Sequence, residues 1–174
     1  MNRVYLAHAI STRGEFEDSK RVANEIRSLG YEVYAAAEND SINDKTNEPT
    51  PLDIYNGDID EIINADIFVV NLSGGLQDGT ISEIGFVAGW NEVRFEIEAD
   101  KAFDIRVGNI PNALDTKSIR IIAYTSNARL LQPQFSDGIP SASANHLVLG
   151  MISKWGGFVG DEEAMLKRLK EEIN

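Results

Sequence analysis

Short apolar runs alternate along this chain with longer segments whose apolar residues recur at helical spacing. Short runs bounded by polar turns predict buried strands; they are residues Val4–Ala7, Tyr31–Ala35, Asp66–Leu72 and Ser118–Tyr124. The helical spacing predicts helices between and after them; these span about residues 16–29, 51–64, 80–91, 144–155 and 161–172. The alternation predicts an α/β fold with a mainly parallel, doubly wound sheet.

The remaining segments are polar or rich in turn residues and predict loops. They are residues 39–51, 73–79 and 132–143, and residues 92–117 are charged and predicted to be irregular. No repeat or linker divides the sequence, so residues 1–174 are expected to form a single domain. In a parallel α/β sheet, ligands bind beyond the carboxyl ends of the strands. We therefore expect the segments after the first and third strands, residues 8–14 and 73–79, to face the site.

Composition narrows the function further. The net charge of −12 opposes binding to phosphate backbones, so no nucleic-acid partner is expected. The chain has no cysteine and two histidines, and therefore no metal site is expected. No apolar run approaches the roughly 18 residues of a membrane span, and no leader segment is recognisable at the N-terminus. We expect a cytoplasmic protein that acts on small molecules.

Asp58 and Glu83 are the two carboxylates that the pattern singles out. Asp58 shares one helical stripe with Ile54 and Ile62, where an unpartnered carboxylate is costly. It could also be structural and tie down a neighbouring loop. Glu83 lies in the first turn predicted after Thr80, so it could close a capping box with Thr80. In the same position the helix dipole would keep it ionised, as a nucleophile requires.

Other polar residues near the predicted site carry weaker signals. Asp78 precedes Gly79 and fits a turn or helix N-cap. Tyr5 on the first strand is either a core aromatic residue or a hydroxyl that orients a carboxylate. His8 and Arg13 are isolated polar residues in a predicted loop. The glycines at 74 and 75 match neither a Walker nor a dinucleotide-binding fingerprint, so no phosphate site is predicted there.

The segment Tyr55–Ala88 resembles the nucleoside 2-deoxyribosyltransferase family. The resemblance rests on Tyr-Asn-x-Asp, an Ala-Asp strand and Gly-Thr-x-x-Glu-Ile-Gly, and extends from about Tyr5 to Gly150. It implies a flavodoxin-like sheet of about five strands with helices on both faces, and no cofactor. It implies transfer of 2-deoxyribose between nucleobases through an ester on a glutamate, with retention of configuration at the anomeric carbon.

The resemblance also implies residue roles. Glu83 is the nucleophile, Tyr5 orients it, and Asp78 protonates the leaving base. Asp58 binds the nucleoside, with His8 and Gly79 nearby in the substrate site. Asn145, in Asn-His-Leu-Val-Leu-Gly, would be donated across the interface of a homodimer or higher oligomer to hold the sugar.

The chain departs from the family pattern after the first strand, where His8-Ala9 replaces Gly-Pro, and at Gln77, where many members carry the acid. Two alternatives stay open. One is an N-glycosidase (hydrolase) of 2'-deoxynucleoside 5'-monophosphates, with residues 11–14 on the phosphate. The other is a non-catalytic nucleotide-binding module in which Glu83 only caps its helix.

Overall fold

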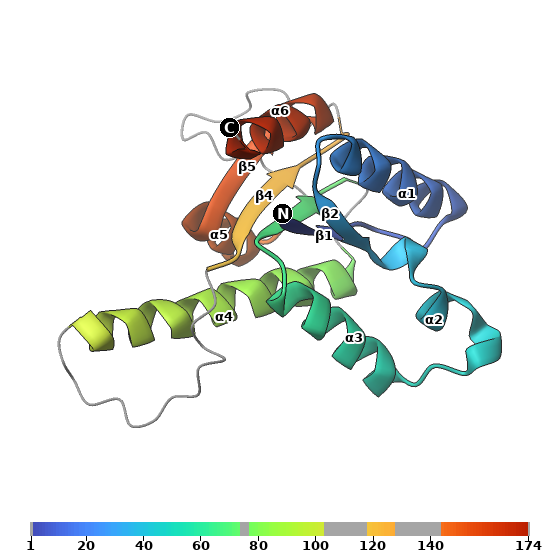
Figure 1. The fold of residues 1–174 in the computed structure, drawn as a ribbon, viewed down its shortest axis with the longest axis horizontal. Coiled ribbons are helices and arrows are strands. Elements are labelled where there is room, and N and C mark those ends of the chain that lie inside the picture. Colours follow the sequence, from blue (N-terminus) through green and yellow to red (C-terminus); the bar gives the residue numbers. More distant parts are fainter. Residues whose placement is uncertain (1, 74–76, 103–117, 128–143, 174) are drawn as a thin grey trace.

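A computed structural model describes residues 2–73, 77–102, 118–127 and 144–173. Five parallel strands form one sheet in the order β2-β1-β3-β4-β5 (Figure 1). The strands are β1 Arg3–Ala7, β2 Glu32–Ala35, β3 Ile67–Asn71, β4 Arg120–Tyr124 and β5 Gly156–Gly160. The order reverses between β1 and β3, which is where doubly wound sheets bind ligands. The predicted α/β class is confirmed.

Helices cover both faces of this sheet. On one face α1 Arg13–Ser28 and α6 Glu162–Ile173 pack in a core cluster with Leu6 and Tyr124. On the other face α3 Pro51–Ile63, α4 Asp78–Ala102 and α5 His146–Trp155 pack in a second cluster. Side chains alternate along β1, so Tyr5 and Ala7 belong to the second cluster while Leu6 belongs to the first.

Local sequence signals fix the starts of α1 and α3. Thr12 and Glu15 form a capping box, and so do Thr50 and Asp53, with Pro51 at the first helical position. Between β2 and α3 the chain forms three short helical pieces: η1 Ala36–Glu38, α2 Asp40–Asn43 and η2 Lys45–Asn47. The last two lie within the loop predicted at residues 39–51. None of the described helices is both long and apolar enough to cross a membrane.

Two elements differ from the sequence-based expectation. Helix α4 continues to Ala102, so the prediction of irregular structure after residue 91 was wrong for residues 92–102. Its second half reaches past the sheet (Figure 1), where Val93 and Phe95 are exposed and no core stripe marks a helix. The strand β5 was missed because glycines fill three of its five positions. A Cβ on Gly156 would meet the Ile121 carbonyl oxygen at 1.8 Å, so β4 and β5 require glycine there. The predicted loop at 132–143 lies outside the described residues.

Candidate active site

Glu83 lies on α4 and points to the sheet. Its Oε1 accepts a 2.6 Å hydrogen bond from the Tyr5 hydroxyl on β1. The helix begins at Asp78, two residues before Thr80, and Thr80 is buried within the first turn. The capping-box interpretation of Glu83 was therefore wrong, because Thr80 is not an N-cap. The carboxylate contacts the sheet instead of its own helix end.

The environment of Glu83 disfavours its charge. Burial raises the pKa of Glu83 to about 7, and the negative charge of Asp58 adds to the rise, while the Tyr5 hydrogen bond opposes it. The sequence argument expected the helix dipole to keep this group firmly ionised. Desolvation outweighs that contribution, since the carboxyl is packed between helix and sheet. A carboxyl that titrates near neutrality is typical of functional sites.

Tyr5 is at once a core aromatic residue and a hydrogen-bond donor. Its ring stacks on Tyr34 at 5.2 Å and on Phe68 at 5.5 Å between ring centroids. Burial, followed by the charges of Glu83 and Asp58, raises the pKa of Tyr5 far above its ordinary value. Its proton is thus retained, and the hydroxyl remains a donor to Glu83. The structure thus combines a buried aromatic ring and a hydroxyl that donates to a carboxylate, and the predicted role of Tyr5 in orienting a nucleophile stays a prediction.

Asp58 forms a second tyrosine–carboxylate pair beside the first. Its Oδ1 accepts a 2.8 Å hydrogen bond from the Tyr34 hydroxyl, which in turn accepts one of 3.1 Å from Asn39 Nδ2. Burial raises the pKa of Asp58, and the Tyr34 bond partly offsets this. The sequence analysis missed Tyr34 and Asn39. The signal is the pairing of Tyr34 with Tyr5 across parallel strands, which is visible only when the register is known.

Asp78 and Gly79 open α4. Asp78 is exposed and its Oδ1 accepts a 2.9 Å hydrogen bond from the backbone N–H of Gly79. Just before them, Gln77 Oε1 accepts a 2.5 Å hydrogen bond from the Ser11 hydroxyl. The segment after β1 is thereby tied to the start of the helix that carries Glu83. Asp78 and Gly79 lie about one helical turn before Glu83 on α4, and the predicted roles of Asp78 and Gly79 stay predictions.

His8 directly follows β1, and its side chain is almost fully buried. Its Nδ1 donates to the Ala9 carbonyl at 2.7 Å, and its Nε2 accepts from Asn71 Nδ2 at 2.9 Å. Asn71 is held in this orientation because its Oδ1 accepts from the Ser73 N–H. The structure therefore brings Tyr5, Asp58 and Glu83 together, whereas His8 contacts Asn71 and lines a pocket with it.

Asn145 is the N-cap of α5. Its Oδ1 accepts a 2.8 Å hydrogen bond from the Leu147 N–H, and both residues are exposed. That arrangement leaves its amide group at the surface of the protomer. Its predicted donation across a subunit interface stays a prediction.

The fold and the paired carboxylates define a class of protein, an α/β domain with two tyrosine–carboxylate pairs on one face of a parallel sheet. Residues 4–109 match the nucleoside 2-deoxyribosyltransferase family, and the chain belongs to this family. Membership supports an activity of the deoxyribosyltransferase or N-glycosidase type. No curated protein matches the sequence.

Solved structures share the fold at low sequence identity. A conserved protein from Enterococcus faecalis V583 aligns with a TM-score of 0.70 and 21% identity, covering 99% of each chain. The CMP N-glycosidase BcmB of Clostridium botulinum aligns at 0.52 and 15%, covering 98% of this chain and 99% of that one. The 2-desoxiribosyltransferase of Leishmania mexicana aligns at 0.50 and 14%, with 85% of each chain covered.

Proposed function

We propose that this protein transfers 2-deoxyribose between nucleobases by cleaving the N-glycosidic bond of 2'-deoxynucleosides, with Glu83 as the nucleophile. The single observation that carries the proposal is the hydrogen bond from Tyr5 to Glu83 Oε1. It holds one carboxylate oxygen and leaves Oε2 to approach an anomeric carbon. Family membership supports the same reaction class.

The first displacement forms an ester. Glu83 attacks C1' of the deoxyribose as the C1'–N bond breaks, and the electron pair leaves with the base. The base nitrogen takes a proton from Asp78 or from water. Glu83 must be ionised to attack, and a pKa of about 7 leaves a large ionised fraction at neutral pH. Most enzymes that cleave glycosides with retention of configuration use two carboxylates close to the reacting carbon.

The second displacement releases the sugar. A second base attacks C1' from the face that the first base left, the ester bond breaks, and Glu83 recovers its negative charge. The proton that the incoming base loses returns to Asp78 or to water, so the cycle is balanced. Water in place of the second base would give hydrolysis, the N-glycosidase outcome. Asp58, oriented by Tyr34, accepts a hydrogen bond from a sugar hydroxyl and holds the ring.

We also propose that the protein is a homo-oligomer in which a residue of one subunit holds the sugar bound to another. The family resemblance implies that a second copy of the chain supplies Asn145, and its amide is exposed at the N-terminus of α5. Its loss should weaken substrate binding without changing the fold. The Asn145→Ser variant keeps an N-capping residue, so α5 is preserved while the amide is removed.

The experiment is a transfer assay with a trapped intermediate. Incubation with deoxyinosine and adenine should yield deoxyadenosine and hypoxanthine by chromatography. Mass spectrometry of the acid-quenched protein should find one 2-deoxyribosyl group on the peptide that contains Glu83. Glu83→Gln should abolish both signals, whereas Glu96→Gln, an exposed change on the same helix, should keep them. A folded Glu83→Gln protein with full activity would overturn the assignment of the nucleophile.

A further inference from the structure

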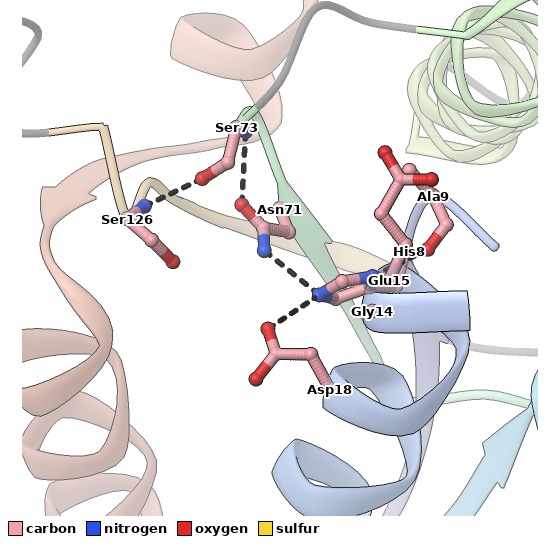
Figure 2. Close-up of a pocket in the computed structure, with 8 residues that line it drawn as sticks. All are labelled: His8, Ala9, Gly14, Glu15, Asp18, Asn71, Ser73 and Ser126. Carbon is pink, nitrogen blue, oxygen red and sulfur yellow. Dashed lines mark hydrogen bonds and ion pairs between the residues drawn. The ribbon is translucent and has the colours of Figure 1, made fainter. Parts of the chain in front are cut away.

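A chain of hydrogen bonds joins β1, β3 and β4 at and beyond their carboxyl ends (Figure 2). The Ser126 N–H donates to Ser73 Oγ at 2.5 Å, and the Ser73 N–H donates to Asn71 Oδ1 at 2.9 Å. Asn71 Nδ2 donates to His8 Nε2 at 2.9 Å, and His8 Nδ1 donates to the Ala9 carbonyl at 2.7 Å. Three neighbouring strands are therefore tied together through side chains as well as through the sheet.

Backbone groups at both ends fix the direction of this hydrogen-bond chain. A backbone N–H can only donate, so Asn71 must present Oδ1 to Ser73 and Nδ2 to His8. A backbone carbonyl can only accept, so His8 Nδ1 must carry the proton that it gives to Ala9. Because Nδ1 carries a proton and Nε2 accepts a hydrogen bond, the contacts require the neutral Nδ1–H tautomer of His8.

Asp18 offers the alternative of a charged ring. Its Oδ2 lies 3.3 Å from His8 Nε2, where a proton on that nitrogen would form an ion pair. Such a proton would face the Nδ2 group of Asn71, and turning this amide over would set Nδ2 against the Ser73 N–H. Asp18 has another partner, because Arg21 donates to its Oδ1 at 2.7 and 3.0 Å. The neutral ring therefore satisfies more of the contacts around it.

The same segments lead into the site of Glu83. His8 follows β1, the strand whose tyrosine donates to Glu83, and Ser73 precedes α4, the helix that carries Glu83. Ser11 donates to Gln77 at 2.5 Å, so the segment after β1 holds the segment before α4 at a second point. A shift between these segments would change the distance between the tyrosine hydroxyl and the Glu83 carboxylate.

We propose that neutral His8 is a positioning residue, which through Asn71 holds the segment before α4 so that Glu83 keeps its hydrogen bond to Tyr5. The inference rests on the proposed function and adds to it a residue that touches no substrate. Both ring nitrogens of His8 contact protein groups and 4% of its side chain is exposed, so neither nitrogen is available to a ligand. The family pattern has glycine at this position, and glycine could not make these contacts.

The first test identifies the tautomer from the ¹⁵N NMR shifts of the ring nitrogens in labelled protein at neutral pH. The chain has two histidines, so His146→Gln, an exposed change, leaves His8 as the one imidazole to be observed. Nδ1 should be protonated and Nε2 unprotonated. In Asn71→Leu the Nε2 shift should change, because that nitrogen loses its donor. A charged ring, or a proton on Nε2 alone, would overturn the inference.

The second test uses two amides that each replace one ring nitrogen. In His8→Gln the side-chain oxygen can take the place of Nε2 and accept from Asn71, whereas in His8→Asn the amide can take only the place of Nδ1 and donate to Ala9. His8→Asn should lower kcat for deoxynucleoside cleavage about three- to tenfold with little change in KM, as expected for loss of one neutral hydrogen bond. His8→Gln should restore most of that activity.

Asn71→Leu breaks the same link from its other side, so its kcat should match that of His8→Asn even if one of the two variants fails to fold. Equal kcat in His8→Gln and His8→Asn, or a rise in KM without a change in kcat, would overturn this inference and leave the proposed function standing. The second of these results would show that His8 contacts the substrate itself. A wild type that cleaves no deoxynucleoside would instead overturn the proposed function, and the positioning role of His8 with it.

Discussion

The site contains two tyrosine–carboxylate pairs on adjacent strands, and their difference explains how one chemical arrangement can serve two roles. Tyr5 and Tyr34 are register partners in β1 and β2, and each donates to a carboxylate on a helix of the same face. The Glu83 pair is the more strongly desolvated, with a pKa of about 7 for Glu83. Two acids whose environments differ in this way suit different tasks, and the roles that we propose for them are nucleophile for Glu83 and sugar anchor for Asp58.

Glu83→Gln should have the largest effect. Loss of the nucleophile should reduce kcat on the order of 10⁴-fold or more, measured as base release. Glutamine can still accept from Tyr5, so the fold should remain. Activity of Glu83→Gln equal to that of the wild type would contradict the assignment of Glu83 as the nucleophile.

The same variant should change how stability depends on pH. The folded pKa of Glu83, about 7, exceeds its ordinary value of 4.5, so the folded state binds more protons between these limits. Wild-type stability therefore falls as pH rises through this window, and Glu83→Gln should escape that fall. Its advantage in urea unfolding should grow from near zero below pH 4.5 to about 3 kcal/mol above pH 7. A pH-independent difference would contradict the burial argument.

Tyr5→Phe should cause the next largest loss of activity. The lost hydrogen bond to a charged group is worth about 1.5–3 kcal/mol, so kcat/KM at pH 7 should fall roughly ten- to hundredfold. The bond lowers the pKa of Glu83, and its removal should move the acidic limb of the pH–rate profile upward. An unmoved limb would show that the hydroxyl does not act on the nucleophile.

Asp58→Asn should move the acidic limb of the pH–rate profile in the direction opposite to that of Tyr5→Phe. The charge of Asp58 raises the pKa of Glu83, so its removal should shift the limb downward. KM should rise at the same time because a sugar contact is weakened, by an expected tenfold or so. A shift in the same direction as that of Tyr5→Phe would contradict the electrostatic coupling between the two pairs.

Tyr34→Phe should have the smallest effect, an increase in KM of about three- to tenfold with little change in kcat. Its hydroxyl acts through Asp58 and keeps the pKa of that residue from rising further. Tyr55→Phe, on the exposed face of α3, is the matched control and should behave as wild type. A larger loss of kcat than in Tyr5→Phe would require Tyr34 to act on the nucleophile.

Much of the fold could be predicted because its strands are apolar runs and its helices carry periodic core residues. The predicted helix at residues 51–64 differs from α3, Pro51–Ile63, by one residue, since Pro51 marks its start. The second half of α4 and strand β5 could not be predicted. The first has no buried stripe over much of its length, and the second is rich in glycine and depends on its contact with β4.

The site was harder to predict than the fold because local patterns have more than one physical meaning. Thr80 and Glu83 have the spacing of a capping box, but the chain starts the helix earlier, at Asp78. The partner of Asp58 is Tyr34, twenty-four positions away along the chain. Such pairings depend on strand register and helix docking, which are set by long-range contacts.

Each reactive carboxylate is on a helix, and the hydroxyl that orients it is on a strand. Neither tyrosine–carboxylate hydrogen bond can form until α3 and α4 have packed against β1 and β2. A newly made or partly unfolded chain would therefore lack the two aligned carboxylates that the proposed reaction requires.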